Sequence, residues 1–298
     1  MNGALLGAVF VVAASTLWGT TGTVATFAPS VSPLAIGAVA MGMGGLLQAL
    51  YAARPIAGHW AGLRGRWQLV SLGAAAVAVY PLAFYSSMHL SGVALGTVIS
   101  IGSAPLASAV IERLAERKEL TRGWMLGALI GVAGAGLLCF AGDSAGRPGA
   151  VSQAWAVPAG VALGLVAGAT YALYSWAAHR LISGGVPSRA AMGAVFGLGG
   201  VLLMPVLVLT GGPLLESWGN FTVGAYMALV PMFAGYVLFG WGLARVRAST
   251  ATGLSLMETV VAAILAVVVV GERLPVLGWL GMVMVLASLF VLTPRASS

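Results

Sequence analysis

Apolar residues form long runs along this chain, and short groups of charged or turn-forming residues separate them. Each run is continuous over about 20 residues, the length that crosses a bilayer as an α-helix. The runs do not alternate with the period of two that a membrane β-barrel requires. An all-α integral membrane protein is predicted, with ten transmembrane helices at 4–28, 33–53, 68–89, 93–112, 122–141, 152–179, 188–210, 219–243, 248–270 and 276–293.

Composition supports this interpretation. Of the 298 residues, 60% are hydrophobic and only 7% are charged, whereas a soluble domain carries about 25% charged residues. No Asp, Glu, Lys or Arg precedes Arg54, and the first apolar run is too long for a signal-peptide core. It is therefore expected to remain as the first helix. The single cysteine, Cys139, cannot form an intramolecular disulfide.

The basic residues predict the orientation. If the N-terminus is cytoplasmic, the gaps after helices two, four, six and eight, together with the C-terminus, hold 12 of the 14 Lys and Arg residues. Only Arg147 and Arg273 fall outside. The positive-inside rule then places both termini in the cytoplasm. The net charge of +7 is concentrated in these gaps, as orientation signals are, and does not indicate a nucleic-acid partner.

A weak internal repeat divides the chain. At an offset of 154 residues, ELTRGWMLG (119–127) aligns with RLPVLGWLG (273–281), and VALGTVIS (93–100) aligns with RASTATGL (247–254). Each half has five helices, and an odd number requires the second half to enter the membrane from the opposite side. We predict a 5+5 inverted repeat, with halves at 1–145 and 150–298 that form one transport domain around a midplane site.

One motif carries a family resemblance. METVVAAILAVVVVGERL (257–274), with Trp-Gly at 18–19 and LGWLG at 277–281, resembles the EamA type of the drug/metabolite transporter (DMT) superfamily. The resemblance covers the whole chain, although Thr259 stands where the family usually has proline. It implies a multi-pass protein of the bacterial inner membrane that exports small metabolites. Among its branches, the amino-acid exporters represented by YddG, which include aromatic substrates, are the most similar; multidrug or amphiphile efflux is the alternative.

Other chemistries lack their motifs. No HExxH, GxSxG or GxxxxGK[ST] pattern occurs, and the three histidines lie in or beside loops. We therefore expect no metal site, cofactor, nucleotide or catalytic residue, and we expect that the chain is not an enzyme. The expected partners are a small-molecule substrate and the lipid bilayer, and a monomer is possible. A membrane enzyme or sensor without transport activity is the alternative from another class.

Small, hydroxyl and aromatic residues occur at membrane depth in both halves. They predict a cavity lined by Trp18, Tyr80, Thr97, Ser100, Tyr171, Ser175, Ser255 and Glu258. For the aromatic residues the alternative is an interfacial anchor or packing within the bundle. Candidate hinges, whose alternative is a static kink, are Pro81, Pro105, Pro231 and Gly253.

Glu258 is isolated in an apolar run, where a carboxylate costs about 2.5–3.5 kcal/mol on insertion scales. Three roles stay open at this point. The carboxylate accepts the ammonium group of a substrate, couples transport to protons, or braces helix nine through a hydroxyl or backbone group of helix six or eight. Its repeat mate is Ala104, so the acid lies in one half only.

Overall fold

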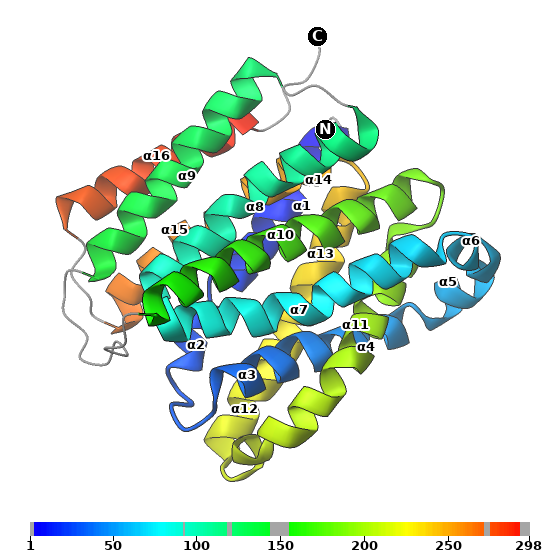
Figure 1. Ribbon diagram of the computed structural model, residues 1–298, viewed down its shortest axis with the longest axis horizontal. Coiled ribbons are helices and arrows are strands. Elements are labelled where there is room, and N and C mark those ends of the chain that lie inside the picture. Colours follow the sequence, from blue (N-terminus) through cyan, green and yellow to red (C-terminus); the bar gives the residue numbers. More distant parts are fainter. Residues whose placement is uncertain (1–2, 92, 118–120, 144–154, 271–274, 293–298) are drawn as a thin grey trace.

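The computed structural model describes residues 3–91, 93–117, 121–143, 155–270 and 275–292, and every regular element within these ranges is helical (Figure 1). The first half contains α1 (Gly3–Trp18), α2 (Thr21–Ala25), α3 (Pro33–Gly37), the π-helical η1 (Ala38–Met43), α4 (Gly44–Tyr51), α5 (Ala53–Gly58), α6 (Trp60–Arg64), α7 (Trp67–Ser91), α8 (Val93–Glu116) and α9 (Arg122–Asp143). The second contains α10 (Ala156–Ser183), α11 (Ser188–Thr210), the 3-10 helix η2 (Gly212–Leu215), α12 (Trp218–Met227), the π-helical η3 (Ala228–Ala234), α13 (Gly235–Leu243), α14 (Ala248–Leu254), α15 (Met257–Leu265), the π-helical η4 (Ala266–Val270) and α16 (Val276–Leu292).

In the described part of the chain, seven helical runs are long and apolar enough to cross a membrane. They are Gly3–Ala25, Pro33–Tyr51, Trp67–Ser91, Ala156–Ser183, Ser188–Thr210, Trp218–Leu243 and Ala248–Val269. Two shorter apolar helices, Arg122–Leu137 and Val276–Leu292, fall in the predicted fifth and tenth spans, and α8 covers the fourth. The all-helical fold class is confirmed for these residues, whereas ten crossings stay a prediction.

The helices begin where local chemistry favours a start. Ser32 caps α3 by accepting a hydrogen bond from the backbone N–H of Ala35, and Pro33 occupies the first helical position. Ser217 caps α12 in the same way, through the N–H of Asn220. The caps satisfy donors that the first helical turn leaves unpaired.

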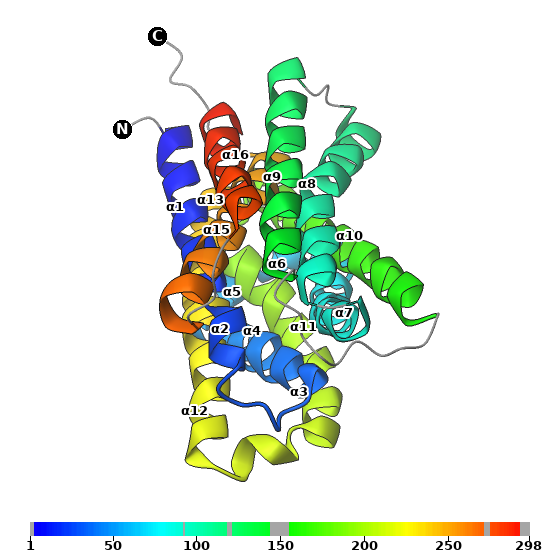
Figure 2. The same ribbon diagram turned by 90° about the vertical axis from the view of Figure 1, so that its left-hand side faces the viewer.

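The packing partners recur between the halves. Helix α7 of the first half packs on α10 of the second half, and α13 of the second half packs on α1 of the first half. Helix α4 lies against α11, and α9 lies against α16, which run together along one edge in Figures 1 and 2. If each predicted span is exchanged for the one five spans along, the α7–α10 pair becomes the α13–α1 pair, and the α4–α11 and α9–α16 pairs are kept. A two-fold relation between the halves requires this.

Close approach of α4 and α11 depends on glycine. A Cβ added to Gly45 would lie 2.2 Å from the carbonyl oxygen of Phe196, whereas one on Gly136 in α9 meets nothing within 4 Å. We expect Gly45→Ala to lower the free energy of unfolding by about 1–3 kcal/mol through overpacking. Gly136→Ala, the matched control, should be neutral or slightly stabilising because alanine favours helix. Thermal unfolding of both variants in detergent tests this, and equal midpoints would contradict it.

Contacts between helix ends gather basic residues at one end of the bundle. Arg66 donates to the carbonyl oxygen of Gly184 at 2.8 Å, and Arg189 donates to the carbonyl oxygen of Tyr51. Arg180 lies 3.9 Å from Glu116 at the end of α8. We call this end, where α4, α8 and α10 finish and α7, α11 and α14 begin, the basic end.

Candidate functional site

Two of the long helical runs are interrupted, and they cross at their interruptions. The first breaks at Gly19–Thr20, between α1 and α2, and the other at Ser255–Leu256, between α14 and α15. A Cβ added to Gly19 would lie 2.6 Å from the Cβ of Val261 and 2.8 Å from the carbonyl oxygen of Glu258. The two backbones therefore touch at a residue without a side chain. Interrupted membrane helices often build ligand sites in this way.

Side chains complete the hydrogen bonding of the irregular helix that faces this crossing. Pro231 lies in η3, and its carbonyl oxygen accepts a hydrogen bond from Nε1 of Trp18 at 2.9 Å. The next carbonyl, that of Met232, accepts from Nε2 of Gln48 at 3.3 Å. Irregular backbone at membrane depth requires such partners because lipid supplies none. Trp18 is thereby held at the end of α1 with its ring against the site.

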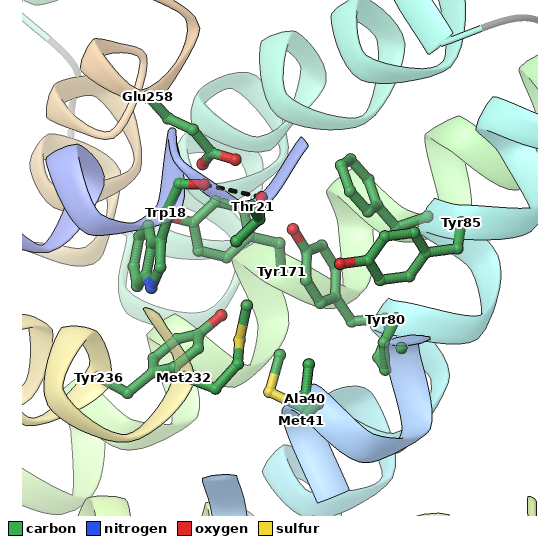
Figure 3. Close-up of a pocket in the computed structure, with 13 residues that line it drawn as sticks. Trp18, Thr21, Ala40, Met41, Tyr80, Tyr85, Tyr171, Met232, Tyr236 and Glu258 are labelled. Atoms are coloured by element: carbon green, nitrogen blue, oxygen red, sulfur yellow. Dashed lines mark hydrogen bonds between the residues drawn. The ribbon is translucent and has the colours of Figure 1, made fainter. Parts of the chain in front are cut away.

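A small cavity lies beside the crossing, and Figure 3 shows its wall. The wall is formed by Trp18, Thr21, Gly37, Ala40, Met41, Tyr80, Pro81, Phe84, Tyr85, Tyr171, Met232, Tyr236 and Glu258. Its free volume of about 20 Å³ holds about one water molecule. The cavity must therefore widen to hold an organic molecule.

Aromatic rings form a large part of the wall. Tyr80 stacks on Phe84 at 5.6 Å between ring centroids and lies 5.7 Å from Tyr171. Trp18 lies 4.7 Å from Tyr236 and 6.3 Å from Tyr171. The five rings come from helices of both halves, and all are buried. Ring faces and edges at these separations form an apolar surface that also attracts cations.

Glu258 supplies the only formal charge in this wall. It lies in the first turn of α15, is half-buried, and directs its carboxylate toward the Trp18–Thr21 segment (Figure 3). The hydroxyl of Thr21 donates to the carbonyl oxygen of Trp18 at 2.7 Å and not to the acid. In the described part of the chain no hydrogen bond or ion pair to the Glu258 carboxylate is seen, so the brace predicted from helix six or eight is not seen there.

The structure brings four of the eight predicted site residues, Trp18, Tyr80, Tyr171 and Glu258, into the wall and places the other four elsewhere. Thr97 donates to the sulfur of Met88 at 3.4 Å, and Ser255 donates to the carbonyl oxygen of Thr252 at 2.8 Å. Ser100 and Ser175 are buried in α8 and α10, which pack together. These two serines therefore lie at a helix interface and not in the cavity wall.

Sequence reasoning left several wall residues out of the site. Tyr236 was missed altogether, and Thr21, Met41 and Met232 gave no signal beyond their place in apolar runs. Tyr85 belongs to the aromatic residues at membrane depth that the sequence suggested for the cavity, and it lies in the wall. For Tyr236 one signal existed: a phenol in an apolar run needs a partner for its hydroxyl, which here is the hydroxyl of Tyr174 at 2.7 Å.

The predicted hinges lie in regular and irregular helix alike. Pro81 and Pro105 lie within the continuous helices α7 and α8, and Pro81 also contributes to the wall. Pro231 lies in η3, and Gly253 precedes the α14–α15 interruption by two residues. Their role as hinges stays a prediction.

A second acid, Glu112 near the end of α8, joins two helices at the basic end. Its carboxylate is 1% exposed, and its oxygens accept from the N–H of Ser249 at 2.9 Å and from the Ser249 hydroxyl at 2.8 Å. One turn away, the hydroxyls of Ser108 and Thr252 are 3.1 Å apart. Ser249 lies in the first turn of α14, where a negative charge is favourable. These contacts hold α8 against α14, and the sequence analysis did not single out Glu112.

The Tyr174–Tyr236 pair offers a test of the wall. We expect Tyr236→Phe to lower the free energy of unfolding by about 1–3 kcal/mol, because the buried Tyr174 hydroxyl loses its partner. Replacing both tyrosines with phenylalanine should recover most of the loss, since no unpaired hydroxyl remains. Thermal unfolding in detergent measures both variants, and a double variant that is less stable than the single one would refute the pairing.

Comparisons with known proteins agree with one another. The model of the EamA-like transporter family matches residues 5–140 and, again, 158–293. The uncharacterized transporter YwfM of Bacillus subtilis (strain 168) is 34% identical over 289 residues, which are 96% of this chain and 93% of the relative. The superposition with a solved crystal structure covers 97% of this chain and 96% of the solved chain, with a TM-score of 0.75 and 19% sequence identity. At that identity the likeness concerns the fold alone.

Proposed function

The chain belongs to the EamA-like transporter family, and from this premise we propose that it exports small metabolites that carry an amino group, with amino acids, aromatic and neutral ones included, as the first class. It is a multi-pass membrane transporter, and proteins of this kind are usually not enzymes. Its finer placement in the YddG branch belongs to the proposal. We also propose that it lies in the bacterial inner membrane and functions as a monomer. Its ten crossings form a 5+5 inverted repeat with halves at 1–145 and 150–298.

One observation carries the substrate proposal: at the crossing of two interrupted helices, a carboxylate without a bonding partner among the described residues faces a wall of aromatic rings. An ammonium group is the natural partner of Glu258, and Trp18, Tyr80 and Tyr171 offer apolar faces to the rest of the molecule. Efflux of amphiphilic cations is the second candidate, because the same wall suits a larger aromatic cation.

The size and surroundings of the cavity support a mechanism of alternating access. A space of about 20 Å³ admits no metabolite, so transport requires a conformation in which the wall opens. The Glu112–Ser249 contacts hold α8 and α14 together at the basic end, which the positive-inside rule places in the cytoplasm. We propose that these helices separate there to admit substrate and that the interruptions at Gly19 and Ser255 let the halves rock.

Transport by purified protein tests the proposal. The full chain in proteoliposomes is preloaded with unlabelled amino acids or aromatic amines, and uptake of the labelled compound is followed with and without a pH gradient. We expect counterflow that protein-free liposomes lack. If no amino acid, amine or cationic dye crosses under any gradient, a membrane enzyme or sensor becomes the better explanation.

A further inference from the structure

We propose that the cavity selects a singly charged aromatic amine over the zwitterionic amino acid with the same side chain. This inference rests on the proposed transport function and changes the order of its substrate classes, since aromatic amines then come before amino acids. It comes from the charges and hydrogen-bond donors that line the cavity.

The charge balance of the wall favours a cation. Among its thirteen residues, Glu258 is the one acid, and none is Arg, Lys or His. A protonated amine beside the deprotonated form of this carboxylate makes a neutral pair. A zwitterion brings its own carboxylate into the same enclosed space, where no side chain of the wall can neutralise it. A buried charge without a partner is strongly unfavourable.

Half of the side-chain hydrogen-bond donors of the wall are already engaged. Trp18 Nε1 donates to the carbonyl oxygen of Pro231, and the Thr21 hydroxyl donates to the carbonyl oxygen of Trp18. The Tyr236 hydroxyl is paired with that of Tyr174. The phenols of Tyr80, Tyr85 and Tyr171 remain, and neutral phenols can bond a carboxylate without cancelling its charge.

The ring faces complete the case for an aromatic amine. The ring centroid of Tyr171 lies 6.3 Å from that of Trp18 and 5.7 Å from that of Tyr80. The three rings are thus close enough to contact one small ligand together. An ammonium over such faces is attracted by their quadrupoles, and more strongly where water is excluded. An aromatic ring on the ligand packs against the same surface.

Binding of three matched compounds tests the inference: 2-phenylethylamine, phenylalanine and 2-phenylethanol. They share a ring and a two-carbon unit, and they differ in charge. With the purified full chain, calorimetry should give a dissociation constant for the amine at least about tenfold below those of the other two. Proteoliposome counterflow should rank the amine first. Phenylalanine that binds or crosses as well as the amine would overturn this inference while leaving the proposed transport function intact, whereas failure of all amines and amino acids to cross would remove both.

A double variant, Tyr80→Phe with Tyr85→Phe, separates the ring faces from the hydroxyls. It keeps every ring of the wall and removes two of the three uncommitted phenols, leaving that of Tyr171. We expect amine affinity to stay within about threefold of the wild-type value, because a cation uses the faces. A loss of about tenfold or more would show that the hydroxyls hold the ligand and would overturn the proposed mode of recognition.

Discussion

Replacing Glu258 with glutamine is expected to lower transport of an aromatic amine by about 10- to 100-fold. A hydrogen bond to a charged group contributes about 1.5–3 kcal/mol, and each 1.4 kcal/mol is a factor of ten in affinity. Glutamine is nearly isosteric with the acid but carries no charge, so the ring wall and the helix crossing stay intact. Initial rates of counterflow in proteoliposomes, corrected for the amount of inserted protein, measure the effect.

Glu216→Gln is the matched control for that variant. Glu216 is an exposed acid just after η2 and does not line the cavity, so its substitution should leave the rate unchanged. Because the described part of the chain shows no bond to the Glu258 carboxylate, Glu258→Gln should also keep the wild-type unfolding midpoint. If it instead unfolds at lower temperature and transports normally once folded, Glu258 is a structural brace and not a substrate ligand.

The fold could be predicted from the sequence because bilayer thickness and the cost of buried charge leave few alternatives. Any run near 20 apolar residues must become a helix. The seven runs that meet the criteria for a crossing all overlap predicted spans. The interruptions could not be predicted in the same way. Gly19 looks like one of many packing glycines, and only its contact with Val261 and Glu258 makes it a crossing point.

The site was partly predictable for a similar reason. Glu258 is isolated in sequence, and Trp18, Tyr80 and Tyr171 are bulky at membrane depth, so each carries a signal of its own. Ser100 and Ser175 carry the same kind of signal, yet they lie where α8 and α10 pack closely. A helix pattern tells which residues share a face, but which face meets a cavity depends on the packing of all helices together. Tyr236 entered the wall through that packing alone.

The contacts at the basic end determine which conformation this structure represents. Glu112 joins α8 to α14 through Ser249, and the Ser108–Thr252 pair lies one turn deeper. Beyond them, α14 gives way to α15, which packs on α1 and α9 rather than on α8. The two helices are therefore closest at the basic end, with Glu258 lying past the contacts. Opening this end must break the Glu112 bonds first.

Glu112→Ala is accordingly expected to shift the protein toward a state that is open at the basic end. Loss of two bonds to a buried carboxylate weakens the closed state by about 1.5–3 kcal/mol, which changes the ratio of the two conformations by about 10- to 100-fold. Double electron–electron resonance measures the separation of α8 and α14 between spin labels placed at the exposed positions Arg113 and Arg247. Cys139 is replaced by serine in this protein so that it carries no label. The variant should add a longer distance that the parent protein lacks.

The control for this variant is Glu216→Ala, which removes an exposed acid and should leave the distance distribution unchanged. Because an open basic end admits substrate from that side, Glu112→Ala should also let a thiol reagent reach a cysteine placed at Ser108, which is buried in the closed state. A distance distribution identical to the parent's, together with an unreactive cysteine, would mean that Glu112 only caps α14 and that another contact closes the basic end. The two readouts are independent, so a general loss of folding, which would broaden all distances, is distinguished from opening at one end.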